Sequence, residues 1–374
     1  MPNIDNLGNV LIRSDLNVPI KNGEITDYYR ILKSVEIVKK ISDKSRTITF
    51  VSHLGRPDGK DLKLSLRPVA EKISEILDKE VHFIEEIYGE KVEKQIEKSE
   101  SKIFLLENLR FEKGETDNDK NFSKQITKPF DSYIFDAFGA AHREHASVVS
   151  FGENLNSFQG PLMDKEIQEL DKLLSNSKSG YSVLLGGAKI SDKLNLIEKL
   201  LPKVENLMVG GGMCFTLLKA LGYEIGKSLL EESFISKAEE LLNSDNGQKI
   251  ILPTDFGVTD SIDSSDRVNI KFSDFKNNHI GIDIGPQTVS DFEKILNKSK
   301  NIFWNGPMGI FEKEEFSYGT RKITEAISNV SGYTCIGGGD SVSAINKFSD
   351  KKYFNHISTG GGASLEYLEG KKLP

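Results

Sequence analysis

Cysteine is scarce in this chain of 374 residues, which holds only Cys214 and Cys335. Two thiols in a chain of this length build no disulfide framework, and their spacing is not that of a metal site. We therefore expect two buried, apolar thiols and a reducing, cytoplasmic setting.

Long apolar runs are missing as well. No stretch approaches the ~20 consecutive apolar residues that a membrane-spanning helix needs. The first residues show neither the basic nor the apolar region of a secretory signal, so we expect no such signal and no membrane segment. Hydrophobic residues still make up 37% of the chain and recur along all of it, which excludes disorder as the main state.

Positive charge is in deficit, with 49 Lys and Arg against 56 Asp and Glu and a net charge of −7. This balance argues against a nucleic-acid partner, because a phosphate backbone demands a basic face. The arginines are unevenly placed, since seven of the nine lie within the first 143 residues. Clusters of adjacent glycines all come after residue 180, which indicates different binding chemistry in the two halves.

The chain alternates short β-branched runs with amphipathic helical stretches. The expected strands are Val10–Leu16, Thr47–Ser52, Val81–Ile84, Ile103–Glu107, Tyr133–Phe138, Val183–Leu185, Leu207–Val209, Lys249–Pro253, Ile302–Trp304 and Tyr333–Ile336. The expected helices are Tyr29–Ile41, Leu66–Leu77, Met163–Leu174, Lys193–Leu201, Phe215–Leu221, Phe234–Leu242, Val289–Leu296 and Tyr318–Ser328.

This alternation predicts an α/β protein with parallel sheets wound by helices on both faces. Ten strands would make one very wide sheet, and at about 150 residues per domain the length favours two domains. The boundary should fall near residues 150–165, where Asn, Ser, Gly and Pro interrupt the pattern. The helix Met163–Leu174 would then connect two doubly wound domains.

Polar residues follow four strands of the front half, at the strand ends where doubly wound sheets bind their ligands. They are Arg13, Asp15 and Asn17; His53, Leu54, Gly55 and Arg56; Glu107, Asn108, Leu109 and Arg110; and His142 and Arg143. Arg30 begins a helix and is expected to project toward the same place. Each arginine alone could be a surface ion pair of little value. Together they predict a pocket for a small, multiply charged anion, because guanidinium groups bind phosphate and carboxylate with two bonds at once.

The other polar side chains in these loops suit different partners. Asp15 and Asn17 would bind a neutral hydroxyl rather than an anion. His53 and His142 could serve as neutral hydrogen-bond partners, as catalytic bases or as plain loop residues, and we favour the first of these.

The glycine runs of the back half suit nucleotide phosphates, which often bind backbone N–H groups where a glycine-rich loop begins a helix. Residues 337–341 (GGGDS) and 360–363 (GGGA) each lie between a predicted strand or loop and a helix, and 186–193 (GGAKISDK) place two lysines four apart on one helix face. Any single run is more simply a tight turn, but three of them favour phosphate binding. Asp340 could hold Mg²⁺, and Ser341 adds a hydroxyl.

Two nucleotide motifs are absent or misplaced. Residues 222–228 (GYEIGKS) resemble a P-loop but have three residues between the glycines instead of four, and they follow a predicted helix instead of a strand. No Gly-x-Gly-x-x-Gly fingerprint is present either, which argues against a dinucleotide-dependent dehydrogenase.

Nine motifs together resemble the phosphoglycerate kinase family, in order from near residue 10 to the end of the chain. They are RSDLNVP (13–19), SHLGRP (52–57), LENLRF (106–111), DAFGAAHR (136–143), LGGAKISDK (185–193), VGGGM (209–213), WNGPMGIFE (304–312), GGGD (337–340) and STGGGA (358–363).

The resemblance implies reversible, Mg²⁺-dependent phosphoryl transfer between ATP and the carboxylate of 3-phosphoglycerate, giving ADP and 1,3-bisphosphoglycerate in glycolysis and gluconeogenesis. It also implies two Rossmann-like domains joined by a helix and a hinge that closes over the substrates. We expect a phosphoglycerate-binding domain at 1–157, a nucleotide-binding domain at 158–356 and a segment 357–374 returning to the first domain. A cytoplasmic monomer without nucleic-acid or membrane partners is expected.

The motifs shared with the family also imply roles for individual residues of this chain. The residues implied to hold phosphoglycerate are Asp15, Asn17, Arg30, His53, Leu54, Gly55, Arg56, Arg110 and Arg143. The residues implied to hold the nucleotide are Lys189, Lys193, Gly281, Asn305, Glu312 (at the ribose), Gly338, Gly339, Asp340 (at the metal) and Ser341. Charge on the moving phosphoryl group would be stabilised by Arg30, Lys189, Lys193 and the helix start at Gly361 and Gly362.

This inventory suits a reaction that needs no general base, because a carboxylate is already ionised at pH 7. Transfer then depends on alignment and charge neutralisation. The chain departs from the family pattern at Gly257, where a bulky apolar residue is usual, at Glu144, where a small one is usual, and at Ser341, where Thr is common. The alternative from another class is a non-catalytic anion- and nucleotide-binding protein that keeps the fold.

Overall fold

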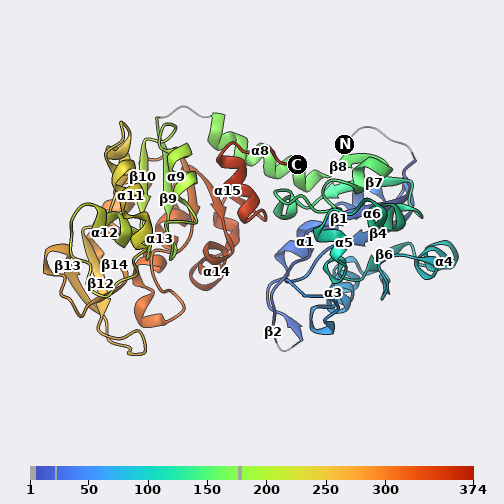
Figure 1. Cartoon of the computed structure of the whole chain (residues 1–374), viewed down its shortest axis with the longest axis horizontal. Helices are drawn as coiled ribbons and strands as arrows, with labels where there is room; N and C mark the ends of the chain where they lie inside the picture. Colours follow the sequence, from blue (N-terminus) through green and yellow to red (C-terminus); the bar gives the residue numbers. More distant parts are fainter. Residues whose placement is uncertain (1–5, 22, 176–178) are drawn as a thin grey trace. The chain divides into compact units, whose positions relative to one another are not determined.

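The computed structural model describes residues 6–21, 23–175 and 179–374 (Figure 1). The chain divides into two compact units, one reaching Ile167 and including Lys372–Pro374, the other spanning Gln168–Lys371. The helix α8 (Pro161–Ser175) contains the division between them. Each unit is built around one parallel sheet.

The sheet of the first unit has the order β5-β6-β4-β1-β7-β8, and every neighbouring pair is parallel. Its strands are β1 (Gly8–Ser14), β4 (Ser45–Val51), β5 (His82–Ile84), β6 (Ile103–Leu106), β7 (Ser132–Asp136) and β8 (Asn156–Gln159). A short hairpin, β2 (Ile20–Lys21) with β3 (Glu24–Ile25), stands apart from it. The helices are α1 (Tyr29–Val35), α2 (Val38–Ile41), α3 (Arg67–Leu77), α4 (Glu90–Lys98), α5 (Lys113–Thr116), α6 (Lys120–Thr127) and α7 (Phe151–Asn154).

Both faces of this sheet are buried, because successive side chains of a strand point to opposite sides. Val10 and Ile12 of β1 pack into one core with residues of α1, α2 and α3. Leu11, between them, packs into a second core with residues of α4, α6 and α7. Strands buried on both faces read as continuous apolar runs, which is why β1 and β4 are recognisable from sequence.

The sheet of the second unit has the order β11-β10-β9-β15-β16-β17, again entirely parallel. Its strands are β9 (Tyr181–Leu185), β10 (Asn206–Val209), β11 (Ile250–Ile251), β15 (Asn301–Asn305), β16 (Tyr333–Gly337) and β17 (His356–Ile357). Numbered along this unit, the spatial order is that of a dinucleotide-binding fold, and its direction reverses between β9 and β15. Ligands of such sheets bind beside that reversal, at the carboxyl ends of the strands.

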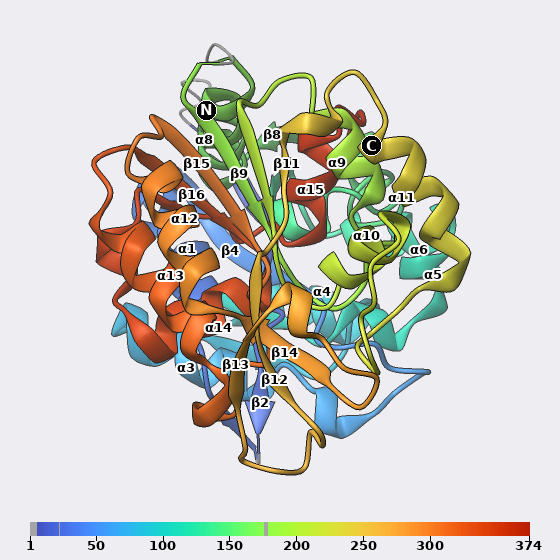
Figure 2. The ribbon, with the colours of Figure 1, turned by 90° about the vertical axis from the view of Figure 1, so that its left-hand side faces the viewer.

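Helices flank this sheet on two sides (Figure 2), with α9, α10 and α11 on one side and α12 and α13 on the other. Their bounds are α9 (Leu194–Leu200), α10 (Cys214–Ala220), α11 (Ile235–Leu242), α12 (Pro286–Leu296), α13 (Tyr318–Asn329), α14 (Gly339–Phe348) and α15 (Gly362–Leu368). The layered α/β architecture with two parallel sheets confirms the predicted fold class.

The second unit also contains a three-stranded antiparallel sheet that the sequence patterns do not predict. It has the order β13-β12-β14, formed by β12 (Asp255–Thr259), β13 (Val268–Lys271) and β14 (Ile280–Ile284). The sequence gives little indication of these strands, because β12 contains Asp and Gly, which are weak strand formers, and β13 is largely exposed.

The ten expected strands are all present, and the edge strands β8 and β17 are additions to them. The expected helix over 29–41 is divided between α1 and α2, although Glu36 and Ile37 keep right-handed helical backbone angles.

The division of the chain into two units also differs from the expected domain boundaries. β8 pairs with β7, so residues 158–159 belong to the first sheet, and α15 packs against α9 of the second unit.

Candidate active site

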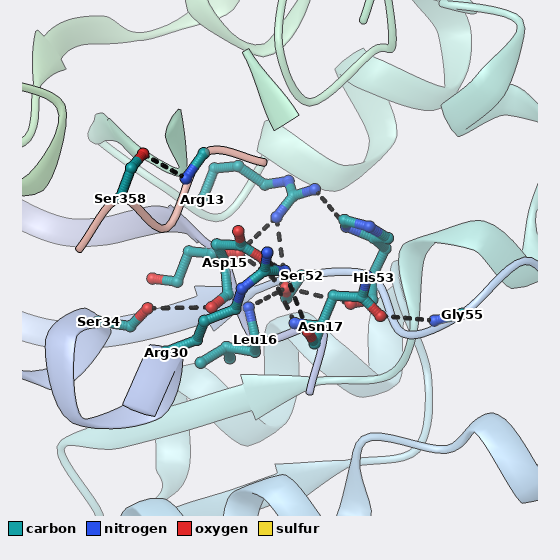
Figure 3. Close-up of polar contacts among 12 residues, drawn as sticks. Arg13, Asp15, Leu16, Asn17, Arg30, Ser34, Ser52, His53, Gly55 and Ser358 are labelled. Carbon is teal, nitrogen blue, oxygen red and sulfur yellow. Dashed lines mark hydrogen bonds and ion pairs between the residues drawn. The ribbon is translucent and has the colours of Figure 1, made fainter. Parts of the chain in front are cut away.

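Arg13 lies buried at the end of β1, with 1% of its surface exposed, and it contacts three side chains, of which Ser52 and His53 are labelled in Figure 3. Its Nε donates to Ser147 Oγ at 2.9 Å, and its Nη1 donates to Ser52 Oγ at 3.3 Å. Its Nη2 lies 2.8 Å from His53 Nδ1. Arg13 therefore links the loop after β4 to the segment that follows β7.

His53 is held in one protonation state by this contact. A guanidinium group can only donate, so His53 Nδ1 must accept from Arg13 and the ring carries its proton on Nε2. Burial lowers the pKa of His53 well below its usual value, and the positive charges of Arg13, Arg110, Arg143 and Arg30 add to this effect. His53 is a neutral hydrogen-bond donor and has no lone pair free to act as a base.

Arg30, in the first turn of α1, contacts the loop after β1 (Figure 3). Its Nη1 donates to Asp15 Oδ1 at 3.2 Å and to the carbonyl of Asn17 at 3.1 Å. The side chain of Asn17 accepts from the backbone N–H of Gly55 at 2.9 Å. Among the described residues, the buried Oδ2 of Asp15 has no hydrogen-bond partner, so this carboxylate can accept from a ligand hydroxyl.

Arg110 lies in the single 3₁₀ turn Leu109–Phe111 that follows β6. The amide of Asn108 joins this turn to the loop after β4, because Asn108 accepts from Leu54 N at 3.2 Å and donates to Leu54 O at 2.8 Å. Arg110 Nη1 then donates to the carbonyl of Gly55 at 2.6 Å.

Positive charge accumulates around Arg110. Burial, together with the neighbouring Arg143 and Arg13, lowers its pKa to about 10. The same arginines help burial to lower the pKa of His145 to about 4. Burial and neighbouring positive charge that lower the pKa of Arg110 mark a place that favours an anion. Arg56 is exposed on the loop after β4, and Arg143 is half-buried after β7.

Three supporting residues of this site carry no sequence signal. Glu115 is fully buried and accepts from both the hydroxyl (2.6 Å) and the N–H (3.0 Å) of Ser147. Ser147 in turn accepts from Arg13, so a buried carboxylate balances the buried arginine that orients His53. His145 stands 3.7 Å from the same carboxylate. Sequence reasoning misses them because Glu115 lies on α5 and its partners His145 and Ser147 lie some thirty positions later, in the segment after β7.

In the second unit, Lys193 lies at the reversal between β9 and β15. Its Nζ donates to Asn305 Oδ1 at 2.5 Å and lies 3.3 Å from the Asn305 carbonyl. Burial lowers the pKa of Lys193 to about 8, against the opposing influence of Asp340 and Asp192. Lys189, four residues earlier, is exposed on the loop between β9 and α9.

Glycine is required where the loops after β9, β10 and β15 meet. A Cβ on Gly186 would lie 2.0 Å from the Pro307 carbonyl oxygen, and one on Gly211 would lie 2.6 Å from Gly187 N. Backbone bonds close the contact, since Gly186 N donates to Asn305 O and Gly187 N to Pro307 O, both at 2.9 Å. Close packing of the backbone therefore accounts for at least some of the glycines that the sequence analysis associated with phosphate binding.

A cavity of about 450 Å³ opens beside these loops. Its lining includes the predicted Gly281, Glu312 and Asp340, together with Gly187 and Gly211. The exposed apolar side chains Leu229 and Ile262 also line it. An apolar hollow beside glycine loops and a lysine suits a nucleotide, whose base is apolar and whose phosphates seek N–H groups and cations.

The remaining predicted residues follow β16 and β17, at the carboxyl edge of the same sheet. Gly338 caps α14 with φ +90°, Gly339 and Asp340 begin that helix, and Gly361 and Gly362 begin α15. Asp340 is exposed. Ser341 is buried, and its hydroxyl accepts from Gly306 N at 2.7 Å, so it supports the loop after β15.

Asp340 is the residue expected to hold Mg²⁺. Within the described ranges, no cluster of three or more His, Cys, Asp or Glu side chains is arranged to bind a metal. Mg²⁺ at phosphoryl-transfer sites is usually held by one or two carboxylates and by the substrate phosphates, so one exposed carboxylate beside the cavity fits such an ion.

Three further expectations concern residues outside the site. Cys214 and Cys335 are buried thiols that form no disulfide, as predicted. The P-loop-like segment 222–228 follows α10 and forms turns, which confirms its rejection. In the parts of the chain that the structure describes, no helix has the length and apolar character to cross a bilayer.

Comparisons with known proteins give one consistent result. The family model described as phosphoglycerate kinase matches residues 5–371. The chain is 47% identical over 370 residues to the phosphoglycerate kinase of Dictyoglomus turgidum, covering 98% of this chain and 93% of that protein. It is 45% identical over 376 residues to that of Thermosipho africanus, with the same coverage of 98% and 93%.

Solved structures are similar as well. The phosphoglycerate kinase of Coxiella burnetii matches with a TM-score of 0.86 at 37% identity, covering 100% of this chain and 95% of that one. The enzyme of Pyrococcus horikoshii matches with a TM-score of 0.88 at 32% identity and the same coverage of 100% and 95%.

Proposed function

The chain belongs to the phosphoglycerate kinase family, whose members are phosphotransferases with a carboxyl acceptor, and we propose how its residues share that reaction. The reaction is reversible transfer of a phosphoryl group between ATP and the carboxylate of 3-phosphoglycerate. The observation that best supports the assignment of roles is the group of arginines around a neutral His53.

The first unit holds the phosphoglycerate in this proposal. Arg56, Arg110 and Arg143 bind its phosphate, and Arg30 binds near its carboxylate. Asp15 and Asn17 bind the hydroxyl, with support from the free lone pairs on Asp15 Oδ2. His53 donates from Nε2, and the backbone of Leu54 and Gly55 holds the loop in place.

The second unit holds the nucleotide. Gly281 and Glu312 line the cavity at the base and ribose, and the Gly338–Gly339 turn receives the phosphates. Lys193, Asn305 and Lys189 stand at the phosphate end, with Ser341 supporting the loop behind them. Mg²⁺, held by Asp340 and the phosphates, would neutralise charge on the nucleotide.

The residues act by position and charge. The attacking carboxylate is ionised at neutral pH, so no proton has to be removed, and His53 in its neutral form does not remove one. Arg30, Lys189, Lys193 and the start of α15 at Gly361 and Gly362 stabilise the negative charge that spreads over the transferring group.

A coupled assay with MgATP and 3-phosphoglycerate tests the proposal and separates it from the non-catalytic alternative. We expect turnover, and we expect it to require Mg²⁺ and to disappear when the metal is chelated. Folded protein that binds both ligands without turnover would instead support a binding protein. The proposal further includes a cytoplasmic monomer, which sedimentation and cell fractionation test, and it assigns phosphoglycerate to the first unit and the nucleotide to the second.

A further inference from the structure

A buried ion pair in the second unit lies outside the residues assigned so far. Arg267 Nη1 is 2.7 Å from Asp283 Oδ2, and the two side chains are 10% and 0% exposed. Arg267 also donates to the carbonyls of Phe316 and Ile284, each at 3.1 Å. Its guanidinium carbon lies 5.3 Å from the centre of the Tyr318 ring. One arginine thus joins the antiparallel sheet to the segment that begins α13.

This arginine occupies space that Gly257 leaves empty. Gly257 is on the central strand β12, opposite Asp283 on β14 and Asn269 on β13. A Cβ on Gly257 would lie 2.6 Å from Arg267 Cζ, so a larger residue there would push the guanidinium group from its place. The φ of Gly257 is outside the left-handed region, so the constraint on this position comes from the arginine and not from the backbone angle.

The ion pair bears directly on the nucleotide cavity. All five residues of β14, Ile280–Ile284, line that cavity, Asp283 among them. Asp283 also accepts from Gly319 N in the first turn of α13, and Ile310 N donates to Ile282 O at 2.8 Å. The position of β14 therefore depends on what Asp283 contacts, and Arg267 is its cationic partner.

We propose that Arg267 is a positioning residue for the nucleotide site, which holds β14 in place through Asp283, and that Gly257 is present to accommodate it. The proposal rests on the function proposed above for the nucleotide cavity. Arg267 need not touch the nucleotide, because it acts on the wall against which the base and ribose lie. Its loss should weaken nucleotide binding and leave phosphoglycerate binding unchanged.

Calorimetric titration of the full chain with ADP tests this. We expect Arg267→Ala to raise the Kd for ADP between about threefold and thirtyfold, as for residues that act through a neighbour. The KM for ATP should rise in parallel, while kcat and the KM for 3-phosphoglycerate stay within about twofold. Arg267→Lys should recover part of the affinity. Arg321→Ala is the matched control, because Arg321 on α13 makes a partly exposed pair with Glu314 at 3.1 Å.

Gly257→Val is a second test of the role of Arg267, because it leaves the arginine in the sequence but moves its side chain. It should weaken ADP binding like Arg267→Ala, and the double variant should bind no more weakly than Arg267→Ala alone, because valine then has nothing to displace. Losses that simply multiply in the double variant would overturn the coupling. Unchanged ADP affinity in Arg267→Ala would overturn the positioning role, even with a lower melting temperature.

The outcome for the function is separate. Turnover by the wild type, with normal ADP affinity in both single variants, would refute this inference and leave the function standing. If the wild type binds ADP but shows no turnover, the proposed function is refuted. The ADP titrations of the variants still test whether Arg267 positions the nucleotide site. A wild type that does not bind ADP would overturn both.

Discussion

The two candidate ligand sites are built by opposite means. In the first unit, long charged side chains from four loops converge, and burial together with the neighbouring arginines lowers the pKa of Arg110 and of His53. In the second, tightly packed glycine backbone and an apolar cavity dominate, with few cations such as Lys193. The difference suits the ligands proposed, since a small anion offers little besides charge and hydroxyls, whereas a nucleotide offers a large apolar base and phosphates.

The largest effect is expected at the phosphates of the nucleotide. Lys189→Ala should lower kcat by at least about a hundredfold, because it removes a charge that stabilises the transition state. Steady-state kinetics at saturating substrates measure it. Lys199→Ala, on the neighbouring helix α9, is the control and should keep kcat near normal. A normal kcat in Lys189→Ala would remove that residue from the reaction.

The next effect sharpens the contrast between the sites. Arg110→Ala should raise the KM for 3-phosphoglycerate about tenfold to a hundredfold, the value of a hydrogen bond to a charged group. The Kd for ADP should not change, since Arg110 belongs to the other unit. Arg67→Ala is the matched control, because Arg67 is half-exposed and pairs with Glu85 at the surface. Equal losses for both ligands would contradict the division of roles.

Titration distinguishes the sites as well. The pKa of Lys193 is lowered to about 8, so this lysine loses its charge as the pH rises through 8. ADP affinity should then be constant below about pH 7 and fall above pH 8, by up to about tenfold per unit. Arg110, with a pKa of about 10, keeps its charge over this range, so 3-phosphoglycerate affinity should hold.

Calorimetry with each ligand from about pH 6.5 to about pH 9.5 measures the difference. Lys193→Arg is the control, since arginine does not titrate there and the dependence should disappear. An identical decline for both ligands would show that some other group is responsible.

The smallest effect is an absence of pH dependence in kcat between about pH 6 and 8. His53 is already neutral and donates from Nε2, and the attacking carboxylate is ionised, so no proton transfer limits the reaction. Rates at saturating substrates measure the profile. A rise in kcat with a slope of one would mean that a base titrates, and His142 would then be the first residue to replace.

Much of the fold and of the first site follows from sequence patterns because the relevant signals are local. Strands such as β1 and β9 are short apolar runs, and the polar residues directly after them lie at the carboxyl edge by the geometry of parallel sheets. That rule alone places Asp15 and Arg110 at one edge. It cannot place Glu115 or Ser147, because Ser147 reaches Arg13 from a distant segment and Glu115 acts through Ser147.

Sequence alone determined the α/β class, the family and the residue types available for charge neutralisation, because each depends on periodicity or on contiguous motifs. Only the tertiary structure decided which ring nitrogen of His53 carries the proton, since its tautomer depends on an arginine forty positions away. It also decided that Ser341 supports a loop and that Gly257 makes room for Arg267. These are contacts between residues distant in sequence, and no local pattern encodes which side chains will share the same space.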